Sequence, residues 1–360
     1  MKIARVETRQ FSLEEGASLL VFLYTDSGIM GVGETSCTKQ PETLHAALEE
    51  AKPRILGFDP INVNAIGAML GSVSDETCNG VWLRVMCGIE AACLDIVGKQ
   101  LGVPVSQLFG GTLRDDIRMC ATCWQQFDDT PEDYGQRASE LSDSGFTAIK
   151  FDPFDHADAL NSGSSLERAV AITCKIREAV GKDVDLIADA NGRFTPSQAI
   201  RAANALEAFG LMWLEDPIES GEMDSLGRVA DAVKVPLGVG ERMVTSQSFR
   251  EVIERQLVDF VQPDCQSVGG MSRTRSIAWL AESYYMSVAL HHSGGPIALA
   301  MNMHVAACAS NLAIVEVPYL FPPWWSEVVK IPFEQRGGAL KVPVGPGLGV
   351  ECFEALLSSA

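Results

Sequence analysis

The sequence has few basic residues and no long apolar segment. Among 360 residues, 28 are Lys or Arg and 47 are Asp or Glu, a formal net charge of −19. A surface of this sign repels phosphate backbones, so we expect no nucleic-acid partner. No stretch approaches the roughly 20 apolar residues of a membrane-spanning helix, so no membrane partner is expected. The first residues lack the apolar run of a signal peptide, which predicts a cytoplasmic protein.

The cysteines also lack an ordered pattern. Cys120 and Cys123 form a C-x-x-C pair, but no second pair follows at a zinc spacing. We interpret all ten cysteines as buried thiols in a reducing compartment. With 47% hydrophobic and 21% charged residues, the composition is that of a globular protein. Its length suits one large α/β barrel or two to three smaller domains.

Two kinds of pattern divide the chain. Residues 1–115 begin with strand-like segments and continue as helices, which predicts an α+β domain. In residues 116–325, strands alternate with helices, and we place eight strands at 117–122, 148–151, 184–188, 212–214, 237–239, 260–262, 287–290 and 313–315. Eight such units predict an α/β fold, a (β/α)₈ TIM-type barrel. A doubly wound open sheet is the rival, but no Gly-rich loop follows the first strand.

The remaining residues, 326–360, are rich in turn-forming residues and end in an apolar stretch. We expect this segment to pack back on the N-terminal α+β domain. The pairs Gly269-Gly270 and Gly294-Gly295 lie after predicted barrel strands. They resemble phosphate-binding loops only weakly, and we interpret them as tight turns between strand and helix.

Three acidic residues recur at one spacing in the predicted barrel. Asp189, Glu215 and Glu241 each follow an apolar run, and successive members are 26 residues apart. One strand-helix unit has about that length, so all three should reach the C-terminal mouth, where barrel enzymes keep their active sites. Their charges would repel one another without a cation, and hard oxygen ligands suit Mg²⁺ better than zinc. Alternatively, they are separate helix caps.

An acid and a histidine follow the next strands. Asp264 and His291 are 27 residues apart, again one unit. A carboxylate that orients an imidazole makes the ring a general base. His292 competes for this role, and adjacent strand residues point in opposite directions, so only one ring can face the mouth. For either histidine a structural hydrogen bond is the alternative.

Charged residues on the second and eighth strands complete the candidates for chemistry. Lys150 and Asp152 are two apart and should share one face. Asp152 would keep Lys150 charged, which favours an electrostatic role, although a base or an exposed salt bridge remains an alternative. Glu316 at the end of the eighth strand could hydrogen-bond a substrate carboxylate if it carries a proton. A surface cap is an equally good interpretation.

The remaining candidates concern substrate binding. Asn191 lies two residues after the first acid and Arg242 directly after the third, so both could contact substrate or its neighbours. Trp82 and Trp124 could line a pocket, although core packing is the alternative for each. We expect substrate identity to depend on loops near residues 12–18 and 72–84.

An ordered set of short motifs resembles the enolase superfamily, mandelate racemase-like group. The motifs are Gly-Phe-Thr-Ala-Ile-Lys at 145–150, Asp-Ala-Asn-Gly at 189–192, Trp-Leu-Glu-Asp-Pro at 213–217, Gly-Glu-Arg at 240–242, Gln-Pro-Asp at 262–264, Ser-Gly-Gly-Pro-Ile-Ala at 293–298 and Pro-Gly-Leu-Gly-Val-Glu at 346–351. Each is weak alone, but the set in this order is specific and spans nearly the whole chain.

This resemblance implies an N-terminal capping domain that closes over the barrel and is completed by C-terminal residues. It implies Asp189, Glu215 and Glu241 as Mg²⁺ ligands, and a small-molecule carboxylate, a sugar acid, as substrate. It also implies an Asp264–His291 dyad as base, Glu316 as partner of the substrate carboxylate, and a homo-oligomer. The expected reaction is Mg²⁺-dependent abstraction of the α-proton, leading to dehydration to a 2-keto-3-deoxy acid.

Two departures from the family pattern limit this prediction. Asp152 stands where the muconate-lactonising and dipeptide-epimerising groups carry a second lysine, which disfavours a two-base racemase. Asn191 stands where galactonate dehydratases place a histidine. A racemase, epimerase or cycloisomerase acting through the same ene-diolate is the first alternative. A non-catalytic acid-sugar binding protein is the second, and a replaced dyad would favour it.

Overall fold

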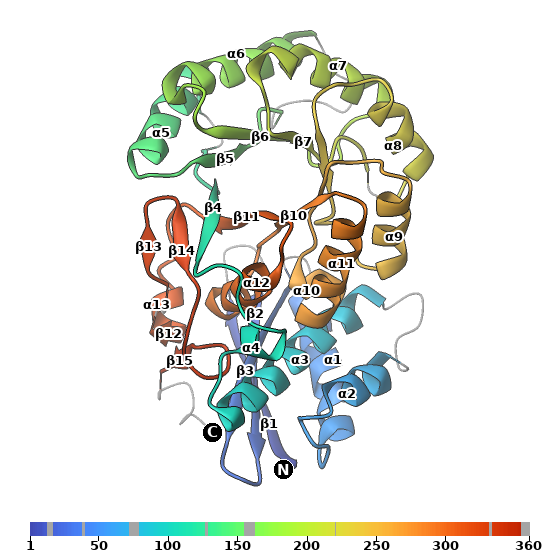
Figure 1. The fold of residues 1–360 in the computed structure, drawn as a ribbon, viewed down its shortest axis with the longest axis vertical. Coiled ribbons are helices and arrows are strands. Elements are labelled where there is room, and N and C mark those ends of the chain that lie inside the picture. The colour runs from blue at the N-terminus through green and yellow to red at the C-terminus, as the bar shows by residue number, and fades with distance from the viewer. Residues whose placement is uncertain are drawn as a thin grey trace.

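The computed structural model describes residues 1–12, 17–37, 40–71, 79–126, 129–154, 163–219, 221–330 and 333–353. A three-stranded sheet with its helices lies beside a ring of strands surrounded by helices (Figure 1). No helix in these ranges is both long and apolar enough to cross a membrane.

The N-terminal sheet is antiparallel, with β1 (Ile3–Ser12), β2 (Ala17–Thr25) and β3 (Met30–Cys37) in sequence order. Four helices follow: α1 (Pro41–Ile55), α2 (Val63–Gly71), α3 (Asn79–Leu101) and α4 (Val105–Leu108). Glycines let α3 lie directly on β3, because a Cβ at Gly31 would come within 2.1 Å of the Ala92 carbonyl oxygen. A Cβ at Gly33 would come within 2.0 Å of the Gly88 carbonyl oxygen.

Eight parallel strands form the barrel: β4 (Asp116–Thr122), β5 (Ala148–Phe151), β6 (Asp185–Asp189), β7 (Trp213–Glu215), β8 (Leu237–Val239), β9 (Phe260–Val261), β10 (Ser287–Leu290) and β11 (Leu312–Pro318). β11 pairs with β4 and closes the ring. The predicted (β/α)₈ barrel is therefore confirmed. One detail differs, because β11 extends to Pro318 and Glu316 lies inside the strand, opposite Cys120.

The barrel interior is a packed core. A buried cluster of small and large side chains fills it, formed by Cys120, Ala148, Ile187, Trp213, Ala289 and Ile314. The surrounding helices are α5 (Pro131–Asp143), α6 (Gly163–Val180), α7 (Pro196–Leu206), the 3₁₀-helix η1 (Glu207–Phe209), α8 (Met223–Ala230), α9 (Ser246–Glu254), α10 (Cys265–Val268), α11 (Met271–Ser283) and α12 (Pro296–Cys308). α12 is buried on nearly every side, which is typical of a helix enclosed between two layers.

The C-terminal segment consists of α13 (Trp325–Val328), β12 (Val329–Lys330), β13 (Gln335–Arg336), β14 (Ala339–Lys341) and β15 (Glu351–Cys352). β14 pairs antiparallel with the start of β4, so the segment extends the barrel sheet. Further along, the Leu348 amide donates a 2.8 Å hydrogen bond to Asp95 of α3. The segment thus contacts both the barrel and the N-terminal domain.

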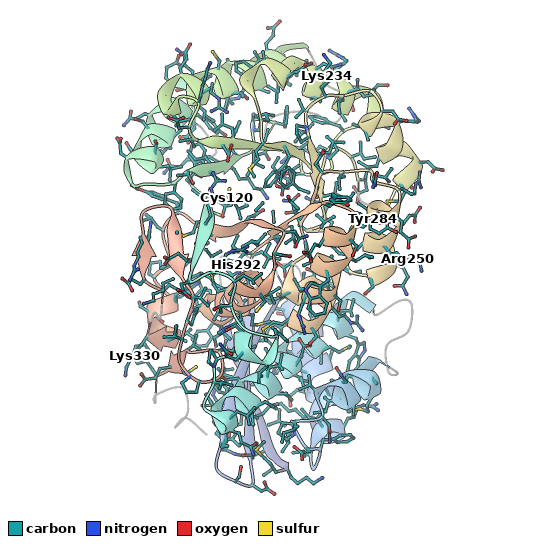
Figure 2. The ribbon with its side chains drawn as sticks, viewed as in Figure 1. Cys120, Lys234, Arg250, Tyr284, His292 and Lys330 are labelled. Atoms are coloured by element: carbon teal, nitrogen blue, oxygen red, sulfur yellow. The ribbon has the colours of Figure 1, made fainter. Side chains whose placement is uncertain are left out.

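The cysteines whose side chains are described carry free thiols. Cys120 is buried inside the barrel (Figure 2). The prediction that all ten are buried is wrong, because Cys123 is exposed. Cys123 directly follows β4, where a φ of 56° turns the chain out of the strand.

Candidate active site

Three acids meet at the C-terminal ends of neighbouring barrel strands. Asp189 ends β6, Glu215 ends β7, and Glu241 follows β8. One oxygen of each lies within 4.8 Å of the others. An octahedral Mg²⁺ with bonds of about 2 Å holds its oxygen ligands roughly 3–4 Å apart, so a small inward movement would fit the ion. These oxygens suit a hard divalent cation.

Two of these carboxylates each have one oxygen bonded to a neutral donor. Asp189 accepts a 2.7 Å hydrogen bond from the Asn191 amide, and Glu215 accepts one of 3.1 Å from the Trp213 indole. The other oxygen of Asp189 and of Glu215 faces the Lys150 ammonium. Glu241 has one oxygen near Arg242 and the other near His291. The acids are therefore oriented from behind while their other oxygens point into a shared centre.

Burial raises the pKa of Asp189 and of Glu215, and the nearby Lys150 ammonium opposes this effect. Burial also acts on Glu241, but the hydrogen bond and charge of His291 outweigh it and hold the Glu241 pKa well below its usual range. The centre is thus a compact group of acids whose charge requires cations nearby.

Lys150 of β5 lies in the middle of this group. Its ammonium contacts Glu215 and lies 3.1 Å from Glu316 and 3.4 Å from Asp189. Burial lowers the Lys150 pKa, but the surrounding carboxylates outweigh this and raise it well above its usual value. Lys150 is therefore a fixed positive charge.

The predicted pairing of Lys150 with Asp152 is wrong. Asp152 lies one residue beyond β5, where the chain turns and the alternation of strand faces no longer applies. Its Oδ1 accepts a 2.9 Å hydrogen bond from the Phe154 amide. Its carboxylate also pairs with the Arg193 guanidinium.

The structure brings the predicted dyad together. His291 Nδ1 lies 2.8 Å from Asp264 Oδ2. The other oxygen, Asp264 Oδ1, accepts hydrogen bonds from the amides of Gln266 at 2.7 Å and Ser267 at 3.2 Å, which caps α10 and fixes the carboxylate. His291 Nε2 points the opposite way and lies 3.2 Å from Glu241. The ring therefore has one nitrogen on its orienting acid and one facing the three acids.

His292 lies elsewhere. Its ring is buried and packs edge-on against Trp325 of α13, at a centroid distance of 5.9 Å. Within the described ranges, its Nε2 has no hydrogen-bond partner. Burial lowers the pKa of His292 to about 4. The structure places this histidine in the packed interior between barrel and C-terminal segment (Figure 2).

The other predicted substrate-binding groups bond one another. The Asn191 side-chain amide donates to Asp152 at 3.1 Å and accepts from Arg242 at 3.0 Å. Arg242 also donates to Asp216 at 3.0 Å and lies 3.2 Å from Glu241. Asn191 and Arg242 thus support the rim of the acidic centre and connect it to the turn after β5.

The remaining predicted residues have structural contacts. The Trp124 indole is buried and donates a 2.7 Å hydrogen bond to the Lys150 carbonyl oxygen, which supports the β5 backbone at the site. Trp82 is buried in the core of the N-terminal domain. Of the loops expected to govern substrate identity, residues 13–16 and 72–78 lie outside the described ranges.

Three charged residues were missed from sequence. Arg193 and Asp216 lie beside predicted residues and pair with Asp152 and Arg242. Glu34 is a fully buried acid of the N-terminal domain, and its carboxylate reaches the start of α12. The signal for Glu34 is a single charged residue within an otherwise uncharged strand, directly after Gly33.

Two family models together match most of the chain. The N-terminal domain of mandelate racemase and muconate lactonizing enzyme matches residues 3–110, and the enolase C-terminal domain-like family matches residues 133–356. A structure of a mandelate racemase/muconate lactonizing enzyme from Sulfitobacter sp. is similar, with a TM-score of 0.91 and 29% identity, over 99% of this chain and 94% of that one. A structure of an enolase superfamily member from Salmonella Typhimurium has a TM-score of 0.91, with 27% identity over 99% and 98%.

Relatives with named activities are also similar over most of their length. The chain is 32% identical to a D-xylonate dehydratase from Haloferax volcanii, over 92% of this chain and 82% of the relative. It is 31% identical to a D-galactonate dehydratase from Ralstonia nicotianae, over 99% and 94%. These matches confirm the resemblance inferred from the ordered motifs.

Proposed function

We propose, because this chain belongs to the mandelate racemase-like group of the enolase superfamily, that it dehydrates a sugar acid to a 2-keto-3-deoxy acid with Mg²⁺ as cofactor. The observation that carries the proposal is one arrangement of side chains. Three acids meet at the barrel mouth, with the Lys150 ammonium among them and the His291 imidazole, oriented by Asp264, facing them.

Asp189, Glu215 and Glu241 would hold the Mg²⁺ ion, since their oxygens are hard ligands and lie close enough together. When bound, the ion supplies positive charge that makes the proton next to the substrate carboxylate more acidic. The Lys150 ammonium would add a second positive charge where negative charge develops on the substrate.

His291 is the proposed base. Its Nδ1 is held by Asp264, so Nε2 carries the lone pair that takes the proton from C2 of the substrate. The hydroxyl at C3 then leaves, and the proton held by His291 returns to it, so that one water is lost. The resulting enol rearranges to the 2-keto-3-deoxy acid. Glu316, beside Lys150, would contact the substrate carboxylate.

Two features narrow the reaction further. Asp152 stands where two-base members of the family carry a second lysine, and it pairs with Arg193, which disfavours a racemase that uses two bases. Asn191, where galactonate dehydratases place a histidine, already bonds Asp152 and Arg242. We therefore propose a sugar acid other than galactonate as substrate.

A cytoplasmic homo-oligomer is the proposed form of the enzyme.

A panel of five- and six-carbon sugar acids with Mg²⁺ tests the proposal, with 2-keto acid formation as the readout. We expect turnover by the wild type and none by His291→Asn. A parallel incubation in D₂O detects exchange of the C2 proton by NMR. Exchange without loss of water would establish a racemase or epimerase instead. Equal binding by both proteins without turnover would establish a sugar-acid binding protein.

A further inference from the structure

A buried acid of the N-terminal domain binds the start of a barrel helix. Glu34 of β3 accepts hydrogen bonds from the amides of Gly295, Ile297 and Ala298, the latter two at 3.0 Å. The Ser18 hydroxyl donates a fourth, at 2.8 Å. Gly295 is the N-cap of α12, and Ile297 and Ala298 lie in its first turn, where amide donors have no carbonyl acceptor within the helix. Both Glu34 oxygens are thus fully used.

The helix that Glu34 holds is tied to the proposed base. α12 begins five residues after His291, and its Asn302 side chain donates a 3.0 Å hydrogen bond to the His291 carbonyl oxygen. The approach is close, because a Cβ at Gly295 would come within 2.6 Å of Glu34. The His291 backbone is therefore fixed to a helix whose start is fixed to β3.

β3 also holds α10, the helix that follows Asp264. Ser36 lies two residues after Glu34, on the same face of β3. Its hydroxyl donates a 2.8 Å hydrogen bond to the side-chain oxygen of Gln266. Gln266 is in the turn of α10 whose amides bond Asp264. Arg84 of α3 adds a 3.1 Å hydrogen bond to Ser267. Both strand-to-helix connections that carry the dyad therefore rest on the N-terminal domain.

The charge of Glu34 matches this role. Burial raises the pKa of Glu34 above its usual value, and the hydrogen bonds from the α12 amides and the Ser18 hydroxyl oppose this only in part. An ionised carboxylate can accept all four hydrogen bonds, and a negative charge is favoured at the N-terminus of a helix. A neutral amide at this position would turn an N–H₂ group toward N–H donors.

We propose that Glu34, with Ser36 beside it, is a positioning residue for the Asp264–His291 dyad. By holding the starts of α12 and α10 from the N-terminal domain, β3 sets where the imidazole stands relative to the three acids. This inference rests on the proposed function for its kinetic consequence only. The N-terminal domain then helps to position His291, in addition to any role in closing over the barrel.

Glu34→Gln tests the proposal with the sugar acid that the wild type dehydrates fastest. A displaced base slows proton transfer, so kcat should fall by about 10- to 100-fold while KM changes by less than about threefold. The primary isotope effect of C2-deuterated substrate on kcat should rise. Mg²⁺ affinity should stay the same, because the three acids lie on β6, β7 and the turn after β8.

Asp95→Asn is the matched control. Asp95 is also a fully buried acid of the N-terminal domain, and it accepts hydrogen bonds from the amides of Val32 and Leu348. Its loss should lower the melting temperature and leave kcat and the isotope effect unchanged. A merely structural role for Glu34 predicts this same pattern for Glu34→Gln, and that result would overturn the proposal.

A measurement without substrate separates this inference from the proposed function. The chain has five histidines, so ring signals of ¹³C-labelled histidine in the metal-free protein can be assigned with His291→Asn. Glu34→Gln should shift the His291 signal and leave that of His45, which lies on α1, in place. An unmoved His291 signal in Glu34→Gln would contradict the positioning role even if the wild type is an active dehydratase. A shifted signal in a protein inactive on every sugar acid would keep it.

Ser36→Ala is the second variant, for use if Glu34→Gln does not fold. It removes one hydrogen bond to α10 and leaves the carboxylate in place. We expect the same pattern at smaller size, with a two- to fivefold lower kcat, roughly the effect of one neutral hydrogen bond. Unchanged kcat together with an unmoved His291 signal would count against the proposal.

Discussion

Buried carboxylates occur in two regions of this protein, and their surroundings differ. In the N-terminal domain, both oxygens of Glu34 accept hydrogen bonds from N–H and O–H donors. At the barrel mouth, Asp189 and Glu215 each have one oxygen held by a neutral donor, while the other faces a neighbouring charge.

The difference separates structural acids from acids available for chemistry. A buried acid with all its lone pairs satisfied gains nothing from a ligand, because its charge is already compensated by fixed dipoles. An acid that has only one oxygen bonded to a neutral donor, and that lies beside like charges, gains greatly from a cation. The following predictions test this comparison, from the largest expected effect to the smallest.

His291→Asn should have the largest effect, because it removes the proposed base from the mouth. General base catalysis contributes about 10²–10⁴-fold, so kcat should fall at least that far while the fold is kept. His304→Asn is the control. His304 is a buried histidine of α12 that bonds Ser106 and Leu348, and its variant should lose stability but keep the isotope effect on kcat. Equal activity losses in both variants would remove the distinction.

Lys150→Met should have the next largest effect. It should lower kcat and raise the affinity for Mg²⁺. Loss of the ammonium removes charge stabilisation from the reaction, so kcat should fall by about 10²–10³-fold. The same loss leaves the acids less compensated, so affinity for Mg²⁺ should rise in a calorimetric titration. Lower affinity in the variant would mean that Lys150 supports the acids and does not compete with the ion.

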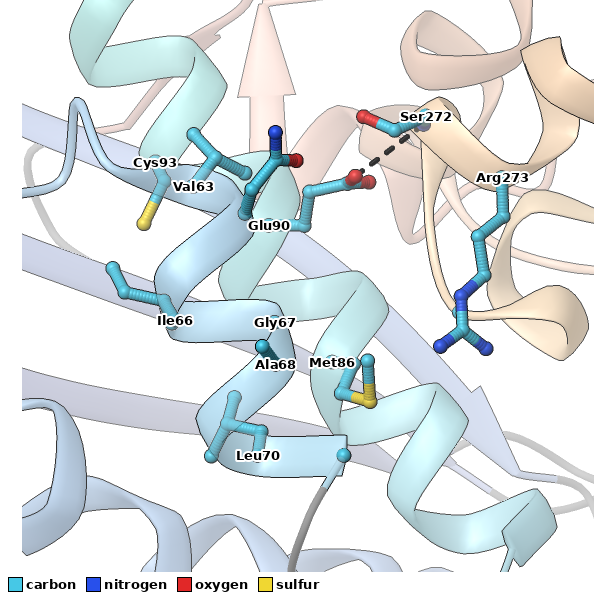
Figure 3. A pocket seen from close by; sticks show the side chains of 13 residues that line it. Val63, Ile66, Gly67, Ala68, Leu70, Met86, Glu90, Cys93, Ser272 and Arg273 are labelled. Carbon is cyan, nitrogen blue, oxygen red and sulfur yellow. Dashed lines mark hydrogen bonds between the residues drawn. The ribbon is translucent and has the colours of Figure 1, made fainter.

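Glu90 is intermediate between the fully hydrogen-bonded acids and the acids at the barrel mouth. Its substitution should have the smallest of the predicted effects. It lies in a pocket between α2, α3 and the start of α11 (Figure 3), where its Oε1 accepts a 3.3 Å hydrogen bond from the Ser272 amide. Its Oε2 is buried, and no hydrogen bond to it is found in the described part of the chain. Burial raises the pKa of Glu90 to about 7.

Stability should depend on pH through this group. Since the folded pKa lies above the unfolded value, Glu90 stabilises the fold below about pH 4 relative to higher pH, and this contribution is lost as pH rises through about 7. Urea unfolding at pH 5 and pH 8 should show a loss of about 1–3 kcal/mol that Glu90→Gln removes. The same loss in the variant would assign the pH dependence to another group.

The sequence predicted the barrel and the main site for a physical reason. One strand-helix unit sets a nearly constant spacing, so Asp189, Glu215 and Glu241 could be placed on one rim, and the barrel itself is confirmed. The dyad followed from the same spacing. These inferences needed only the repeat, which is a local property of the sequence.

Contacts across domains could not be predicted in this way. Glu34 meets Gly295 from 261 positions away, and no spacing rule connects them. Asp152 was paired with the wrong partner because the strand ends one residue earlier than the alternation required. Such errors arise where tertiary packing or a turn determines the direction of a side chain.

Calorimetric titration of the metal-free protein with Mg²⁺ tests the central claim most directly. The account predicts one ion per chain, loss of binding in Glu215→Gln, and unchanged binding in Asp95→Asn, whose carboxylate is already satisfied. Chelation should abolish dehydration, and Mg²⁺ should restore it. Full turnover by chelated enzyme, or equal Mg²⁺ binding by the wild type and Glu215→Gln, would contradict the account.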